Sequence, residues 1–264
     1  MATPPPAGVS RPASAADRAE GDKHPPKTGP RVLIAVCTLR ESENITAMLT
    51  QLRHQVPRAD LLVVDDDSSD GTAELARRFA AADHDPDTGQ TEVVVRQQRG
   101  LGSAIAATMQ AAVRGGYDFL VNLDADFSHD PAAVPTLIDA AVTHGADVAV
   151  GSRYTGGGRI EGWPLHRRWM SRRVNRLAIR RLGLPVSDCS GSMRCYRVAA
   201  LSAMDPSKLS SPGYSVLEEI LHRLHQQGCS MVEVPITFTD RTAGSSKLTA
   251  AEAIRSLWRI VRMG

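Results

Sequence analysis

The sequence predicts an α/β fold with a mostly parallel sheet and helices on both of its faces. After residue 30, short apolar runs of strand length alternate with longer amphipathic segments, a pattern typical of parallel sheets built from β-α units. The 264 residues are 42% hydrophobic and 23% charged, which is ordinary globular usage and length enough for one large core. We expect a Pro-, Ala- and Gly-rich disordered tail at 1–30, one domain at 31–249 and a C-terminal helix at 250–264.

The expected strands are mostly continuous apolar runs. A run without polar interruption is typical of a strand covered on both faces. Pro235 interrupts the last run and favours an edge position, because proline cannot donate a hydrogen bond to a neighbouring strand. The strands are expected at residues 32–36, 61–64, 92–96, 119–123, 148–151 and 231–239.

The expected helices are amphipathic. Ile45, Met48, Leu49 and Leu52 recur at the i, i+3, i+4, i+7 spacing of one helix face. Gly228 follows a helical pattern where a helix commonly ends. The helices are expected at residues 45–52, 72–82, 101–114, 131–144, 167–182, 215–227 and 250–263, with a short segment opening at 199–201.

Composition excludes several classes of protein. A formal charge of +2 argues against a histone-like polyanion binder, and no stretch has the roughly 20 apolar residues of a spanning helix. The four cysteines form neither a CxxC pair nor a disulfide framework. Their spacing favours reduced thiols in a cytoplasmic protein. They are Cys37, Cys189, Cys195 and Cys229.

The sharpest polar motif is Asp124-Ala125-Asp126, directly after the fourth expected strand. Residues i and i+2 of a strand point to the same side, so both carboxylates can converge on one cation. Oxygen ligands favour Mg²⁺ or Mn²⁺. The alternative is a solvated turn that caps the next helix, but Asp130-Pro131 already supplies that cap.

Two further polar clusters, 40–44 and 65–72, follow the first two expected strands. In open α/β sheets, ligands bind beyond the carboxyl ends of the strands. Asp65 or Asp66 is therefore a candidate acceptor for a nucleobase or ribose. The alternative is that the polar residues at 68–70 only cap the following helix.

A positively charged helix is expected in the second half of the chain. No acidic residue falls between 162 and 187, and guanidinium groups are well suited to phosphates. A solvated helix face is one alternative and a nucleic-acid-binding module is another, although the near-neutral chain shows no nucleic-acid-binding motif. The arginines are Arg167, Arg168, Arg172, Arg173, Arg176, Arg180 and Arg181.

From residue 31 to about 249, the chain resembles the polyprenol-phosphate (dolichol-phosphate) mannosyltransferases of glycosyltransferase family 2. The resemblance implies the Rossmann-like GT-A fold. The matching stretches are CTLRESEN (37–44), VVDDDSSDGT (63–72), LDADFSHDP (123–131), GSRYTGGG (151–158), WPLHRRWMSR (163–172), SGSMRCYR (190–197) and VPITFTDRTAGSSKL (234–248).

The resemblance also implies roles for particular residues. Cys37 and Arg40 depart from the Pro and Asn that the family often carries, which leaves the identity of the donor open. The implied catalytic residues are Asp126, Arg153 and Arg167. The implied donor-site residues are Glu41, Asp66, Asp124, Ala125, Asp126, Arg241 and Lys247. The implied metal ligands are Asp124, Asp126 and Ser128, and the lipid-phosphate ligands are Arg153, Arg167 and Ser171.

The implied reaction is inverting transfer of mannose from GDP-mannose to a dolichyl or polyprenyl monophosphate, with Mg²⁺ or Mn²⁺ as cofactor. UDP-glucose or another sugar nucleotide is the alternative donor. The other class of alternative is a regulatory or nucleic-acid-binding module that uses the arginine-rich helix, but no nucleic-acid partner is expected.

The implied acceptor is a membrane lipid, so a membrane surface is an expected partner. The C-terminal segment has an apolar face (Ile254, Leu257, Trp258, Val261) and a basic one (Arg255, Arg259, Arg262). Such a helix can lie among lipid head groups, or it can pack on the core or on a membrane-anchored protein. We expect a cytoplasmic protein, peripheral on the cytoplasmic face of a membrane.

Overall fold

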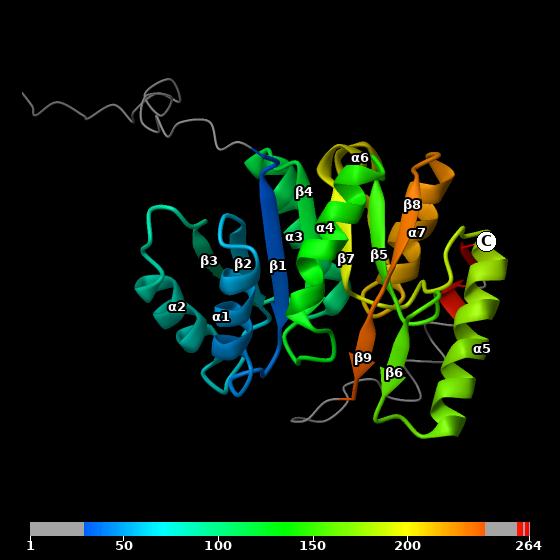
Figure 1. The fold of residues 1–264 in the computed structure, drawn as a ribbon, viewed down its shortest axis with the longest axis horizontal. Helices are drawn as coiled ribbons and strands as arrows, with labels where there is room; N and C mark the ends of the chain where they lie inside the picture. Colours follow the sequence, from blue (N-terminus) through cyan, green and yellow to red (C-terminus); the bar gives the residue numbers. More distant parts are fainter. Residues whose placement is uncertain (1–28, 241–257, 261, 264) are drawn as a thin grey trace, which may run out of the picture. The chain divides into compact units, whose positions relative to one another are not determined.

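The computed structural model describes residues 29–240, 258–260, 262 and 263. The body that begins at Arg31 is built on a seven-stranded sheet of order β3-β2-β1-β4-β7-β5-β8 (Figure 1). Only β7 runs antiparallel, to both β4 and β5, so the predicted mostly parallel sheet is confirmed. The strands are β1 (Val32–Thr38), β2 (Asp60–Asp65), β3 (Thr91–Val95), β4 (Phe119–Asp124), β5 (Val148–Ser152), β7 (Arg194–Arg197) and β8 (Met231–Pro235).

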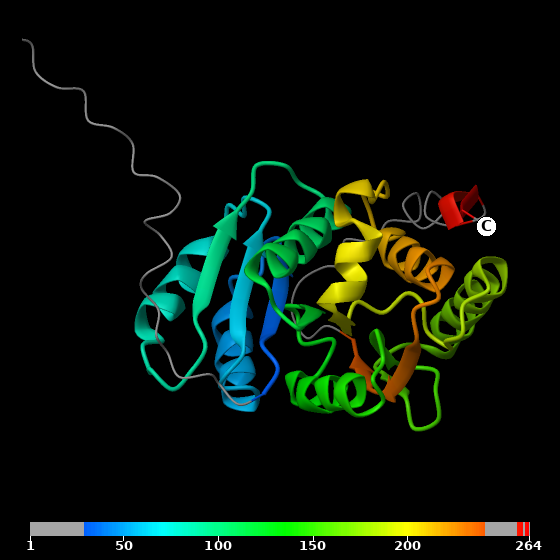
Figure 2. The same cartoon turned by 90° about the horizontal axis from the view of Figure 1, so that it is seen from above.

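Helices cover both faces of this sheet, as predicted (Figure 2). In β1, Leu33 and Ala35 enter one core cluster, whereas Ile34 and Val36 enter the other. This two-sided burial explains why the strand is apolar throughout. The helices are α1 (Ile45–Gln55), α2 (Thr72–Ala82), α3 (Leu101–Gly115), α4 (Val134–Thr143), α5 (Leu165–Leu182), α6 (Val198–Met204) and α7 (Val216–Gln226), with the 3-10 turns η2 (Pro131–Ala133) and η3 (Pro206–Lys208).

The expected strand at 231–239 is two strands in two sheets. β8 forms the edge of the large sheet, as Pro235 predicted, and β9 (Thr237–Thr239) pairs with β6 (Arg159–Glu161). Ile236 separates them, because its N–H donates to Ser152 at 3.0 Å while its carbonyl accepts from Arg159 at 2.9 Å. The sequence interpretation missed β6 and β7, and the prediction of one continuous strand was wrong.

The C-terminal helix is described only at residues 258–260 and 262–263, all helical. Ile260 is buried in the core, whereas Trp258 is 60% exposed with the Arg262 guanidinium 4.2 Å from its ring centre. The rest of the predicted apolar face (Ile254, Leu257, Val261) lies outside the described residues, as does the tail at 1–28.

The described part of the chain contains neither a disulfide nor a membrane-spanning helix. All four cysteines lie in it, and each is a free thiol. Among the described helices, none is both long and apolar enough to cross a bilayer.

Candidate active site

A cavity of about 330 Å³ opens where β1, β2 and β4 end. These strands are parallel neighbours, so their carboxyl ends share one edge of the sheet. Five residues predicted for the donor site line this cavity together: Glu41, Asp66, Asp124, Ala125 and Asp126. Cys37 also lines it, and burial raises the pKa of its thiol to about 12, which keeps the thiol protonated.

The chain turns sharply after each of these three strands. Arg40, Asp67 and Phe127 have positive φ angles of 57°, 55° and 56°. Left-handed backbone is uncommon outside glycine and is found where a site fixes the chain. The turns at Asp67 and Phe127 each directly follow a carboxylate that lines the cavity, and the turn at Arg40 directly precedes one, Glu41.

Asp65 and Asp66 have different surroundings. Asp65 is fully buried and accepts hydrogen bonds from Thr38 Oγ1 at 2.7 Å and from Ser68 N–H at 2.8 Å, so it fixes the local chain. Asp66 lines the cavity and accepts from Gly100 N–H at 2.7 Å and from Arg96 at 3.1 Å. Burial raises the pKa of Asp66, although these two donors oppose the rise.

The Asp124-Ala125-Asp126 motif presents oxygen ligands. Ser192 Oγ donates to Asp124 at 2.7 Å, and Ser128 N–H donates to Asp126 at 3.0 Å. Ser128 Oγ is buried and has no hydrogen-bond partner among the described residues. Two carboxylates and this hydroxyl fit an oxygen-preferring cation such as Mg²⁺ or Mn²⁺. Within the described residues, no group of three or more His, Cys, Asp or Glu is gathered for a metal.

One wall of this cavity was not predicted from the sequence. Residues 212–214 line the cavity, and their loop packs so closely on α3 that a Cβ at Gly102 would lie 1.9 Å from the Ser211 carbonyl oxygen. Glu219 holds this loop by accepting from the N–H groups of Ser210 at 3.0 Å and Ser211 at 2.8 Å. Only glycine allows this close approach, so Gly102 was the sequence signal that could have indicated this wall.

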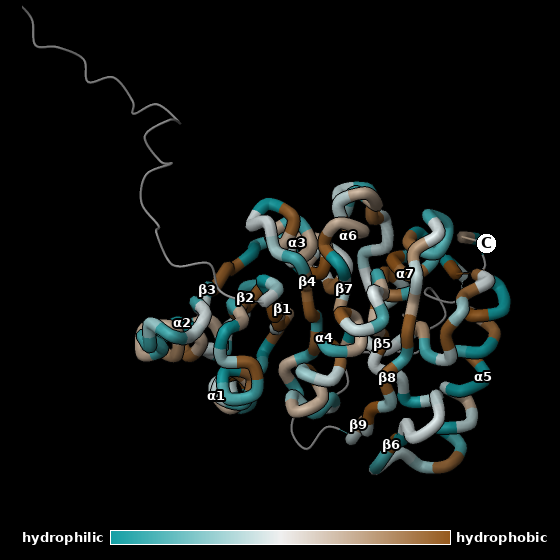
Figure 3. Tube along the Cα trace, turned by 45° about the horizontal axis from the view of Figure 1, so that its top comes forward, coloured by the Kyte–Doolittle hydropathy of each residue, from teal (hydrophilic) through white to brown (hydrophobic). Residues whose placement is uncertain are grey.

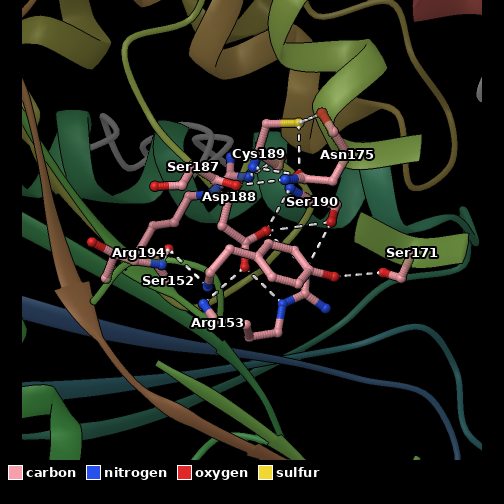
Figure 4. A network of polar contacts seen from close by, with 11 residues as sticks. Ser152, Arg153, Ser171, Asn175, Ser187, Asp188, Cys189, Ser190 and Arg194 are labelled. Carbon is pink, nitrogen blue, oxygen red and sulfur yellow. Dashed lines mark hydrogen bonds and ion pairs between the residues drawn. The ribbon is translucent and has the colours of Figure 1, made fainter. Parts of the chain in front are cut away.

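A second cavity, of about 950 Å³, lies between the β6 region and α5 and is lined by Arg153, Arg168 and Arg172. Arg153 is 7% exposed and donates to the two carboxylate oxygens of Asp188 at 2.7 and 2.8 Å (Figure 4). It also donates to Ser190 Oγ at 2.7 Å. Burial would raise the pKa of Asp188, but the Arg153 charge and hydrogen bonds hold it below its ordinary value.

Arg167 and Ser171 are not among the residues that line this cavity, although both lie on α5, which contributes part of its lining. Arg167 pairs with Asp240 at 3.2 Å and lies 3.9 Å from the Trp163 ring centre. Ser171 shares a 2.7 Å hydrogen bond with the hydroxyl of Tyr154.

The ring of Phe238 connects the two arginines. Its centre lies 5.3 Å from that of Trp163 and 5.4 Å from the Arg153 guanidinium. The sequence analysis predicted no site role for three residues of this region: Tyr154, Asp188 and Asp240.

Two segments join the cavities. In residues 188–192, Asp188 and Ser190 hold Arg153 while Ser192 donates to Asp124. In β9, the Thr239 N–H donates to the Ser128 carbonyl at 3.0 Å. The carboxylates and Arg153 are thus tied to one frame. The predicted donor-site residues Arg241 and Lys247 lie outside the described residues.

Comparison with known proteins places the chain in a family. Residues 33–204 match the model of "Glycosyl transferase family 2". The chain is 37% identical over 235 residues to polyprenol monophosphomannose synthase of Mycolicibacterium smegmatis (89% of this chain, 87% of that protein) and 37% identical to undecaprenyl-phosphate mannosyltransferase of Micrococcus luteus (89% and 94%). It is 30% identical to dolichol-phosphate mannosyltransferase of Pyrococcus furiosus (88% and 64%).

Solved structures share the fold. Glucosyl-3-phosphoglycerate synthase of Mycobacterium tuberculosis, in complex with Mn²⁺ and UDP, aligns with a TM-score of 0.56 at 16% identity (89% of this chain, 78% of that chain). A mannosyltransferase of Pyrobaculum calidifontis, in complex with GDP-Man and Mn²⁺, aligns with a TM-score of 0.54 at 19% identity (82% and 58%). With the family model covering most of the body, the chain belongs to glycosyltransferase family 2 and has the GT-A fold.

Proposed function

We propose that the protein transfers mannose from GDP-mannose to a polyprenyl or dolichyl monophosphate, with inversion at the anomeric carbon. The names of the three relatives support the sugar and the acceptor class. The observation that carries the proposal is the segment 188–192, which contacts Arg153 with one end and Asp124 with the other. One short segment thus holds both the guanidinium that would bind the acceptor phosphate and a carboxylate that would bind the cation, as transfer between two phosphates requires.

On the donor side, Glu41 and Asp66 would line the nucleotide part of the cavity. A divalent cation, Mg²⁺ or Mn²⁺, held by Asp124, Asp126 and Ser128 would neutralise charge on the leaving diphosphate. Arg241 and Lys247 would add positive charge to the same diphosphate. Ala125 would allow the diphosphate to approach the backbone between the two carboxylates.

On the acceptor side, the chemistry needs no general base. A phosphate monoester has its second pKa at about 6, so at neutral pH it is mostly a dianion that already carries its nucleophilic oxygen. Arg153 is fixed by its ion pair and would bind and orient this dianion without reorganisation. Arg167 and Ser171 would complete the phosphate site.

Membrane association is the second part of the proposal. Exposed Trp169 and Trp258, each with an arginine guanidinium close to its ring, at 4.0 and 4.2 Å, support a peripheral position at a lipid surface. We place the protein on the cytoplasmic face, where a sugar nucleotide would be its donor. A membrane-anchored protein is a further candidate partner for the C-terminal segment.

The test is transfer of radiolabelled mannose from GDP-mannose into an organic-extractable, acid-labile lipid, with and without EDTA. We expect a metal-dependent product that Asp126→Ala abolishes. Parallel reactions with UDP-glucose and other sugar nucleotides examine the donor. Absence of a lipid product from GDP-mannose, whether or not another sugar nucleotide gives one, would overturn the proposal.

A further inference from the structure

A third cavity, of about 360 Å³, lies beside α5 and is lined by Arg172, Arg176 and Arg180. Val186 and Ser187 contribute another part of its lining. Tyr154 and Arg172 line both this groove and the 950 Å³ cavity that holds Arg153. The groove therefore borders the proposed acceptor site without containing its residues Arg153, Arg167 or Ser171.

The three arginines form one row because they are four residues apart on a helix. Each is exposed, and among the described residues none of the three has a carboxylate within ion-pair distance. Among the lining residues, Ser187 donates its Oγ hydrogen to the Glu233 carboxylate at 2.5 Å. Like charges four residues apart repel each other, so an anion between these guanidinium groups would remove an unfavourable interaction.

The same helix also carries exposed apolar side chains. Trp169, Met170, Val174 and Leu177 are 60%, 56%, 43% and 50% exposed. Figure 3 shows the resulting mixture of hydrophobic and hydrophilic residues along α5. A free phosphate or a nucleic acid gains nothing from such neighbours, whereas a phospholipid places acyl chains next to its phosphate.

We propose that the Arg172–Arg176–Arg180 groove binds the head-group phosphate of an anionic membrane phospholipid. Guanidinium groups bind phosphate oxygens in pairs of parallel hydrogen bonds, and the exposed apolar side chains of α5 would enter the edge of the acyl layer. The bound lipid would hold the neighbouring cavity against the bilayer. This site rests on the membrane association proposed above and deepens it, but it does not depend on the proposed transfer reaction.

The test is flotation of the full chain with phosphatidylcholine vesicles, with and without phosphatidylglycerol. The variant is Arg176→Gln with Arg180→Gln, which leaves Arg172 and the acceptor cavity intact. The matched control is Arg77→Gln with Arg114→Gln, which removes two exposed arginines from α2 and α3. We expect the α5 variant to bind phosphatidylglycerol vesicles about 30-fold more weakly, and the control to change by less than about twofold.

Two further measurements distinguish the ligand. A blue shift of tryptophan fluorescence with phosphatidylglycerol vesicles, lost in Trp169→Phe, would support insertion beside the groove, and transfer to a short-chain acceptor in detergent should be unchanged in the α5 variant. Equal losses in variant and control would overturn the proposal. So would full competition by millimolar inorganic phosphate, or a loss of RNA binding with vesicle binding unchanged.

Discussion

The carboxylate cavity and the arginine cavity are built by different means. In the first, Asp66, Asp124 and Asp126 occupy the ends of neighbouring parallel strands or the turns after them, so the backbone determines their positions. In the second, Arg153 is held by the side chain of Asp188, which is 35 residues away in the chain. The difference teaches that loss of a carboxylate from the first cavity should affect chemistry more than stability, whereas loss of the ion pair that holds Arg153 should destabilise the fold.

The largest effect is expected from Asp188→Ala. The substitution leaves the Arg153 guanidinium buried without its counter-charge, which should destabilise the fold by about 3–5 kcal/mol. Urea denaturation measures the change. The matched control is Asp240→Ala, because its ion pair with Arg167 is about 40% exposed on each side and should contribute about 1 kcal/mol at most. Equal losses in the two variants would contradict the proposed difference between a buried and an exposed pair.

Asp126→Asn tests the other cavity. Asparagine keeps the oxygen that accepts from the Ser128 N–H, so stability should change little, whereas loss of the charge should lower turnover by ~10²–10³-fold. Steady-state transfer rates and a thermal melt measure the two quantities. Asp130→Asn, in the same loop, removes an equal charge while preserving the cap on Ala132, and it should keep nearly full activity. Similar activity in the two variants would exclude a special role for Asp126.

The first half of the chain was predictable because its signals are local. Continuous apolar runs end in acidic clusters, and parallel topology then brings those clusters together. The strands near 32–36, 61–64 and 119–123 and the cap at Asp130 are present as predicted. The left-handed turns at Asp67 and Phe127 carried no such signal, since neither residue is a glycine.

The second half was less predictable because its structure depends on contacts between distant segments. β7 contains Arg194, which is fully buried and donates to the carbonyl oxygens of Cys189 and Leu217 at 2.6 Å each. An arginine inside a short strand shows no apolar periodicity. Likewise, nothing local to Asp188 indicates that its partner is Arg153.

Glu218→Gln tests whether the buried carboxyl group of Glu218, on α7, makes stability depend on pH. Burial raises the pKa of Glu218 to about 7, so the native state binds more protons than the unfolded state. Stability should therefore fall as the pH rises from about 5 to about 8, by ~3 kcal/mol in all. Denaturation midpoints across this range measure the slope.

In the Gln variant, most of this slope should disappear, with higher stability at alkaline pH. Glu74→Gln, on the exposed face of α2, is the matched control and should preserve the slope. The lowered pKa of Asp188 acts in the opposite direction, since its stabilisation is lost only as the pH falls to acid values. A slope that is unchanged in Glu218→Gln would assign the effect to another group.

The smallest effect is expected from Tyr154→Phe, which asks whether a neutral hydrogen bond also matters in the arginine cavity. Burial raises the pKa of Tyr154, so its hydroxyl stays protonated in the 2.7 Å hydrogen bond with Ser171. Loss of this hydrogen bond should weaken acceptor binding by about 1 kcal/mol. The acceptor KM should therefore rise about fivefold, while kcat and the donor KM stay unchanged. Ser171→Ala alone should have a similar effect, and the double variant should add little to either single change because the two hydroxyls form one hydrogen bond. Fully additive effects, or a change in the donor KM, would show that Tyr154 does not act by positioning Ser171.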